Sequence, residues 1–191
     1  MKKNNNLVEL NKFLKNPAYL DLEPQIAMQL AKRLYKNNLN IRKRSFKLAI
    51  LSNFNLDFII EPIYFCLFQR GINADIITTD YGTMIPELLN PKSKTLKLKP
   101  DIILIWPTYR DIQKYDESPD SEVSFWRAIW KISIKRNIKI FHVLFDKPPF
   151  ININNSFNLR KNNLLSHVNR TNQILENKFS NKVNLISIET L

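Results

Sequence analysis

Short apolar runs alternate with amphipathic stretches from residue 46 onward. The apolar runs fall at 47–51, 74–78, 101–106, 138–145 and 183–188, and stretches with helical spacing fall at 57–70, 84–89, 121–136 and 164–179. This alternation is typical of βα units whose strands form a parallel sheet. With right-handed crossovers, the pattern predicts a flavodoxin-like, three-layer α/β/α sandwich built on a five-stranded parallel sheet.

The residues before this region have a different pattern. Apolar residues recur at helical spacing between residues 5 and 39, with interruptions at Pro17 and Pro24. A chain of 191 residues can bury the core of one ordinary domain. We therefore expect a helical N-terminal appendage at 1–45 and one α/β domain at 46–191.

Polar residues follow several of the predicted strands, where they would share one edge of the sheet. Ligands of open parallel sheets bind at the carboxyl ends of the strands, near the switch in strand order. This rule selects the candidate ligand-binding residues Ser52, Asn53, Asn55, Asp80, Tyr81, Thr108, Arg110 and Asp146.

A hydrolase at this edge needs a nucleophile, a base and an orienting carboxylate. The candidate catalytic residues are Ser52 with Asp57 or Asp111. The base is not obvious, because His142 lies inside a predicted strand as a core residue and His167 lies on the polar side of a predicted helix.

The turn after the first strand also has a purely structural interpretation. Asn55 suits the N-cap of the helix at 57–70, and Asp57 complements the helix dipole. Gly71 follows this helix as a C-cap should. The free N–H groups of the first turn would equally accept an anion or an oxyanion, so capping, binding and catalysis all stay open.

The composition limits the cofactors, metals and cellular compartments that we expect for this chain. Two glycines in the whole sequence exclude Gly-rich phosphate loops, and no metal-ligand spacing recurs, so we expect no cofactor and no metal. Cys66 lies in an apolar run, which predicts a buried free thiol in a reducing compartment. The N-terminus lacks an apolar signal segment, and no apolar stretch approaches the ~20 residues of a membrane span. We expect a cytoplasmic protein without membrane contact.

The chain is basic, with 29 Lys plus Arg against 17 Asp plus Glu and a formal net charge of +12. Such a balance can indicate a polyanionic partner. The basic residues spread over many segments, which is typical of a solvated surface, and we expect no nucleic-acid partner. The local cluster Arg42, Lys43 and Arg44 is the candidate partner-binding patch.

Several short motifs occur in an ordered series. They are NFNLD at 53–57, GINADIITTDY at 71–81, ELLNP at 87–91, KPDIIL at 99–104, FDKPPF at 145–150, HVNRTNQIL at 167–175 and VNLISIETL at 183–191. In this order they resemble the N-terminal domain of FkbH-like proteins, a subfamily (IIIC) of the haloacid dehalogenase (HAD) superfamily. The resemblance covers residues 47–191 and implies an SGNH-hydrolase-like α/β sandwich.

The same resemblance implies partners. In that family a HAD-type catalytic domain follows this domain, and full-length members transfer a glyceryl unit to an acyl carrier protein. The D-x-D-x-T motif of that catalytic domain is absent here. Systems of this type serve polyketide, nonribosomal peptide or polysaccharide biosynthesis. An acyl carrier protein or a separate HAD-type domain is therefore the expected partner.

The catalytic blocks of active SGNH hydrolases are also incomplete. Ser52-Asn53-Phe54 stands where their Gly-Asp-Ser block falls, and their closing Asp-x-x-His block has no His in the matching region, Ser187 to Thr190. We expect a non-catalytic module that binds or positions a partner. The alternatives are a stand-alone SGNH-type esterase or acyltransferase and, further, a nucleic-acid-binding protein.

Overall fold

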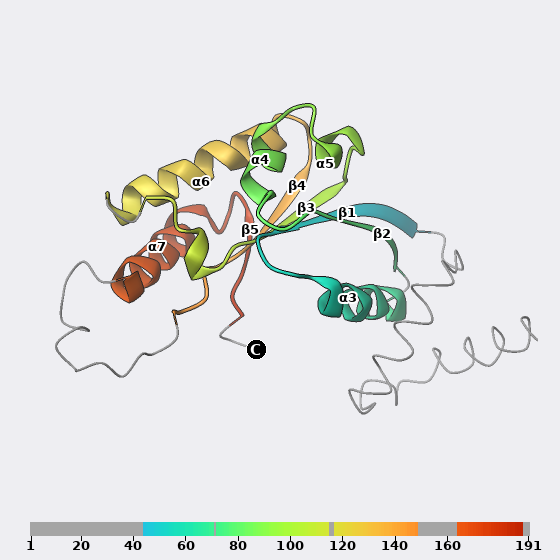
Figure 1. Ribbon diagram of the computed structural model, residues 1–191, viewed down its shortest axis with the longest axis horizontal. Coiled ribbons are helices and arrows are strands. Elements are labelled where there is room, and N and C mark those ends of the chain that lie inside the picture. Colours follow the sequence, from blue (N-terminus) through green and yellow to red (C-terminus); the bar gives the residue numbers. More distant parts are fainter. Residues whose placement is uncertain (1–43, 71, 115–116, 149–163, 189–191) are drawn as a thin grey trace, which may run out of the picture. The chain divides into compact units, whose positions relative to one another are not determined.

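The computed structural model describes residues 44–70, 72–114, 117–148 and 164–188 (Figure 1). They fall into two compact units. The first contains Arg44, Ser45 and Asp57–Ala74, and the second contains Phe46–Leu56 and the described residues from Asp75 onward. The predicted appendage at 1–45 and the predicted C-cap at Gly71 lie outside the described residues, apart from Arg44 and Ser45.

Five strands form one sheet, in the order β2-β1-β3-β4-β5. The strands are β1 (Arg44–Ser52), β2 (Ile72–Thr78), β3 (Ile102–Trp106), β4 (Lys139–Val143) and β5 (Asn184–Ile186). The pairs β1–β3, β3–β4 and β4–β5 are parallel. The predicted α/β fold with a five-stranded parallel sheet is confirmed.

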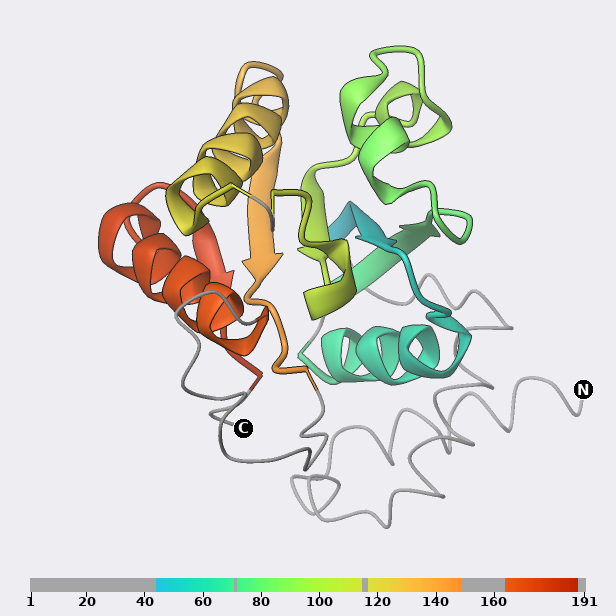
Figure 2. The ribbon, with the colours of Figure 1, turned by 60° about the vertical axis from the view of Figure 1, so that its left-hand side comes forward.

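Apolar side chains of the strands and of two long helices make the core of the second unit. The helices α6 (Pro119–Ile134) and α7 (Leu164–Phe179) contact each other, and α6 contacts β4 (Figure 2). Trp126 and Trp130 of α6 are almost fully buried, and both rings meet the imidazole of His142 edge to face. This aromatic cluster anchors α6 on the sheet.

Helix bounds follow from local capping. The helices α4 (Met84–Leu89) and α7 have the predicted bounds. Helix α6 begins two residues earlier than predicted, because the Ser118 side chain caps it and Pro119 takes the first turn, where proline needs no N–H partner. Two short elements were not predicted, α5 (Lys94–Lys97) and a 3₁₀ turn at Tyr109–Asp111, since neither has an apolar period.

The helix α3 (Asp57–Gln69) belongs to the first unit. Its side chains Ile60 and Tyr64 are buried, whereas Phe58 is 61% exposed. Cys66 is exposed, so the expectation of a buried thiol was wrong. Apolar residues occur around the whole circumference of α3, so its sequence has no single apolar face from which the buried side could be told from the exposed side.

Candidate functional site

The carboxyl ends of the strands meet at one edge of the sheet. Ser52, the last residue of β1, pairs in register with Trp106, the last residue of β3. The Thr79 hydroxyl, just after β2, donates to the Ser52 carbonyl at 3.4 Å. Asp146 follows β4 and accepts a hydrogen bond from the Tyr109 N–H at 2.7 Å. The candidate residues after β1 to β4 in the second unit therefore share this edge.

The Ser52 hydroxyl is part of its own turn. The side chain donates to the Phe54 carbonyl at 2.9 Å, and the residue is 1% exposed. A nucleophile needs an accessible oxygen whose proton faces a base. Here the proton is held by a backbone oxygen. Asp57, proposed as its partner, is the first residue of α3 and belongs to the first unit.

Asn53 and Asp111 form the centre of the edge. The Asn53 amide donates to Oδ1 of Asp111 at 2.6 Å, and its own oxygen accepts the Met84 N–H at 3.2 Å. The other carboxylate oxygen of Asp111 accepts from the Thr108 N–H and hydroxyl, which closes a capping box around the 3₁₀ turn. Three donors thus hold both oxygens of this buried carboxylate.

Both histidines of the chain are buried. His142 is fully buried, accepts a hydrogen bond from the Trp130 indole at Nδ1, and has its pKa lowered by desolvation to about 3. His167 is 7% exposed, and burial also lowers its pKa. The prediction of a core role for His142 is in accord with this position. The placement of His167 on the polar side of its helix was wrong, because the buried stripe of α7 includes it beside Val168 and Thr171.

The remaining candidates lie in solvent or act through their backbone. Tyr81 is 81% exposed, and Asp80 accepts from Thr83 through its main-chain carbonyl. Arg110 is exposed, stacks on the Tyr109 ring and donates to the Tyr109 hydroxyl, which raises the pKa of the guanidinium. Asn55 is also exposed. Of the candidate patch, Arg42 and Lys43 lie outside the described residues, and only the backbone of Arg44 is described.

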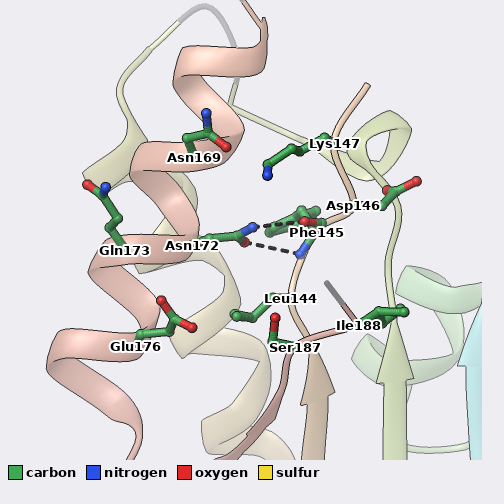
Figure 3. A pocket seen from close by; sticks show the side chains of 10 residues that line it. All are labelled: Leu144, Phe145, Asp146, Lys147, Asn169, Asn172, Gln173, Glu176, Ser187 and Ile188. Carbon is green, nitrogen blue, oxygen red and sulfur yellow. Dashed lines mark hydrogen bonds between the residues drawn. The ribbon is translucent and has the colours of Figure 1, made fainter. Parts of the chain in front are cut away.

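A pocket of about 480 Å³ opens farther along the same edge (Figure 3). Its walls come from the chain after β4, the chain after β5 and one side of α7. The lining residues are Leu144, Phe145, Asp146, Lys147, Asn169, Asn172, Gln173, Glu176, Ser187 and Ile188. Sequence reasoning had named only Asp146 among the candidate site residues. A signal was available, because FDKPPF, HVNRTNQIL and VNLISIETL all contribute to these walls.

Asn172 fastens the pocket wall of α7 to the chain after β4. Its amide donates to the Phe145 carbonyl at 2.8 Å, and its oxygen accepts the Phe145 N–H at 3.1 Å (Figure 3). One side chain therefore satisfies both backbone groups of a buried residue, in the manner of a neighbouring strand. This clamp joins α7 to the chain just beyond the end of β4.

No group of three or more His, Cys, Asp or Glu side chains among the described residues is arranged to hold a metal ion. None of the helices described is both long and apolar enough to cross a membrane.

No protein-family model matches the chain, and no curated protein does. Among solved structures, the chain is similar to the N-terminal part of a Bacteroides fragilis protein, which contains a phosphatase domain and was crystallised with Mg. The TM-score is 0.66 at 14% identity, over 84% of this chain and 44% of that chain, so this chain spans less than half of that structure. A second similar structure is a GDSL-like lipase from Bacteroides thetaiotaomicron, with a TM-score of 0.48 and 12% identity over 84% of this chain and 78% of the lipase. At 14% identity, the first likeness shows a shared fold alone.

Proposed function

We propose that this chain is a non-catalytic binding module on an SGNH-hydrolase-like scaffold. The observation that carries the proposal is that Ser52 and Asp111, the candidate nucleophile and acid, are both engaged in structural hydrogen bonds. The Ser52 hydroxyl is buried and donates to a backbone carbonyl, and the Asp111 carboxylate is held by Asn53 and Thr108. A serine nucleophile needs a histidine or an equivalent base together with an orienting acid. Here the Ser52 hydroxyl and the Asp111 carboxylate make hydrogen bonds to other groups instead.

The partner follows from the resemblance to FkbH-like proteins. We infer an FkbH-type system that activates glycerate-derived or related units on an acyl carrier protein, with this module positioning the carrier or a separate HAD-type catalytic domain. The phosphatase domain of the Bacteroides fragilis neighbour supports the second partner. The net charge of +12 supports the first, since an acidic carrier would be attracted to a basic surface.

Hydrolysis of generic esters tests the proposal. We expect the full chain to release no product above the rate of the Ser52→Ala variant, because Ser52 is not a nucleophile. Ser93→Ala is the matched control, since Ser93 is a buried serine that caps α5 through its side chain. Saturable turnover that Ser52→Ala reduces by orders of magnitude, while Ser93→Ala keeps it, would establish the esterase alternative.

Carrier binding is the positive half of the test. We expect the chain to retain an acyl carrier protein, but not random duplex DNA, on an affinity surface at near-physiological salt. Tight DNA binding without carrier binding would replace the module with a nucleic-acid-binding protein. If the chain retained neither the carrier nor an isolated HAD-type domain, the proposal would be wrong.

A further inference from the structure

The side chains that α7 contributes to the pocket lining are all polar. Asn169, Asn172 and Glu176 are spaced i, i+3 and i+7, so they share one face of the helix. Figure 3 shows Asn172 reaching the chain after β4 at Phe145, with Asn169 and Glu176 on either side of it along the helix, and all three line the pocket. Within the described part of the chain, neither the Asn169 amide nor the Glu176 carboxylate has a hydrogen-bond partner. Two groups with strong hydrogen-bonding capacity thus face the pocket unused.

The opposite wall is partly apolar. Leu144 is buried, and Ile188 is 40% exposed. A pocket with an apolar wall and a few convergent polar groups is the usual form of a small-molecule site. Its volume of about 480 Å³ lies within the roughly 300–1,000 Å³ of such sites and accommodates a ligand the size of one sugar ring.

The charges of the lining restrict the ligand class. Asp146 and Glu176 are acidic and Lys147 is basic, so both signs occur around one small space. The Asp146 carboxylate accepts the Tyr109 N–H and is directed away from α7 (Figure 3). An anion would therefore face the Glu176 carboxylate, and a cation would face the Lys147 ammonium. Hydroxyl groups both donate and accept, so they satisfy a carboxylate, a carboxamide and an ammonium alike.

We propose that this pocket binds a small uncharged ligand rich in hydroxyl groups, of the polyol or sugar class, with Asn169 and Glu176 as its main polar contacts. This inference rests on the proposed function, because it names the ligand class of the binding module. Asn172 acts as a positioning residue, since its amide is already engaged with Phe145.

Side-chain amide signals of the ¹⁵N-labelled full chain provide the test. The probes are D-glucose, D-glucuronate and D-glucosamine, which share a ring and differ in charge. We expect D-glucose to cause saturable shifts of the Asn169 and Asn172 NH₂ signals. The Asn90 and Asn177 signals, outside the pocket lining, should stay in place. Tighter binding of either charged sugar, equal shifts at all four amides, or no saturable shift would overturn the proposal.

Single substitutions test whether Glu176 contacts the ligand. Glu176→Ala should weaken D-glucose binding by about tenfold, as expected for loss of a charge-assisted hydrogen bond. Glu117→Ala is the matched control, because Glu117 is an exposed carboxylate that pairs with Lys114 away from the pocket lining. An unchanged affinity of the Glu176→Ala variant would contradict the proposed contact. Ester hydrolysis that depends on Ser52 would defeat the module proposal while leaving this titration intact, so the two failures are distinguishable.

Discussion

The Asn53 amide and the Asp111 carboxylate, 58 residues apart in the chain, are joined by a hydrogen bond of 2.6 Å. This contact connects the turn after β1 with the turn after β3, and through the Asn53 oxygen it also holds the start of α4. Asp111 is 5% exposed, so its charge depends on these donors for stabilisation. Asp111, a candidate catalytic acid, therefore serves here to join the turns after β1 and β3.

Asn53→Ala should lower the free energy of unfolding by about 1–3 kcal/mol, because a buried carboxylate loses one of its three donors. The matched control is Asn177→Ala, an exposed position of α7, which should change stability by no more than about 0.5 kcal/mol. Urea denaturation of both variants measures the difference. Equal stability of the two would show that the Asn53–Asp111 bond contributes nothing net.

Asn172→Ala should also destabilise the protein, by about 1–3 kcal/mol, since the backbone N–H and C=O of buried Phe145 both lose their partner. Asn169→Ala provides a control in the same helix and the same pocket, because this amide has no hydrogen-bond partner within the described residues. Thermal unfolding compares them. A stability loss of the same size in both variants would rule out a special role for the Asn172 clamp.

The buried His142 side chain should make the free energy of unfolding depend on pH below 6.5. Burial lowers its pKa from 6.5 to about 3, so between these values the unfolded chain takes up a proton that the folded chain refuses. Stability should therefore fall as the pH decreases from 6.5 toward 3. His142→Gln, which keeps an acceptor for the Trp130 indole, should reduce this slope. At pH 8 the imidazole is neutral in both states, so the difference in unfolding free energy between variant and wild type there measures packing alone. If the variant kept the wild-type dependence of stability on pH, His142 would not be its source.

Glu122 should make stability fall as the pH rises, which is opposite to the effect of His142. Its carboxylate is fully buried, accepts from the Trp126 indole and the N–H groups of Gln113 and Lys114, and has its pKa raised by desolvation. The folded chain then holds a proton that the unfolded chain has released, so this group's contribution is lost as the pH rises above 4.5 through the raised pKa.

Glu122→Gln should remove this fall, although its NH₂ group meets an N–H donor and lowers stability at every pH. The exposed Glu117→Gln variant should keep the fall, since Lys114 lowers the pKa of Glu117 and its titration lies below 4.5. Denaturation between pH 4.5 and 7 measures both. A wild-type slope in Glu122→Gln would exclude Glu122 as the source.

The basic residues are tested as a docking patch for a carrier protein. Replacing Arg42, Lys43 and Arg44 by alanine should slow association with an acyl carrier protein and reduce its salt dependence, while folding stays unchanged. The control replaces Lys135, Arg136 and Lys139, which are exposed at the end of α6 and the start of β4. Surface plasmon resonance at two salt concentrations distinguishes them. An equal effect of both triple variants would assign the attraction to net charge rather than to the patch.

Local patterns were sufficient for the elements of the fold. The alternation of apolar runs and amphipathic stretches predicted all five strands of the sheet and the bounds of α4 and α7. Strands covered on both faces need continuous apolar runs, and helices packed on a sheet need an apolar stripe with a period of 3.6 residues. The same patterns predicted which turns follow strands, and hence which polar residues share the carboxyl edge. They failed at α5 and at the 3₁₀ turn, which side-chain caps stabilise without an apolar period.

Which polar groups bond to each other at the carboxyl edge of the sheet is decided by the tertiary structure. The sequence could name Ser52 and Asp111 as chemically competent, but the pairing of Asp111 with Asn53 requires the β1–β3 register, and the turn of the Ser52 hydroxyl toward Phe54 requires the local backbone path. The pocket is assembled from three segments after β4, within α7 and after β5. Segments so far apart in the chain are brought together by the crossovers of the sheet, and a local period carries no information about such contacts.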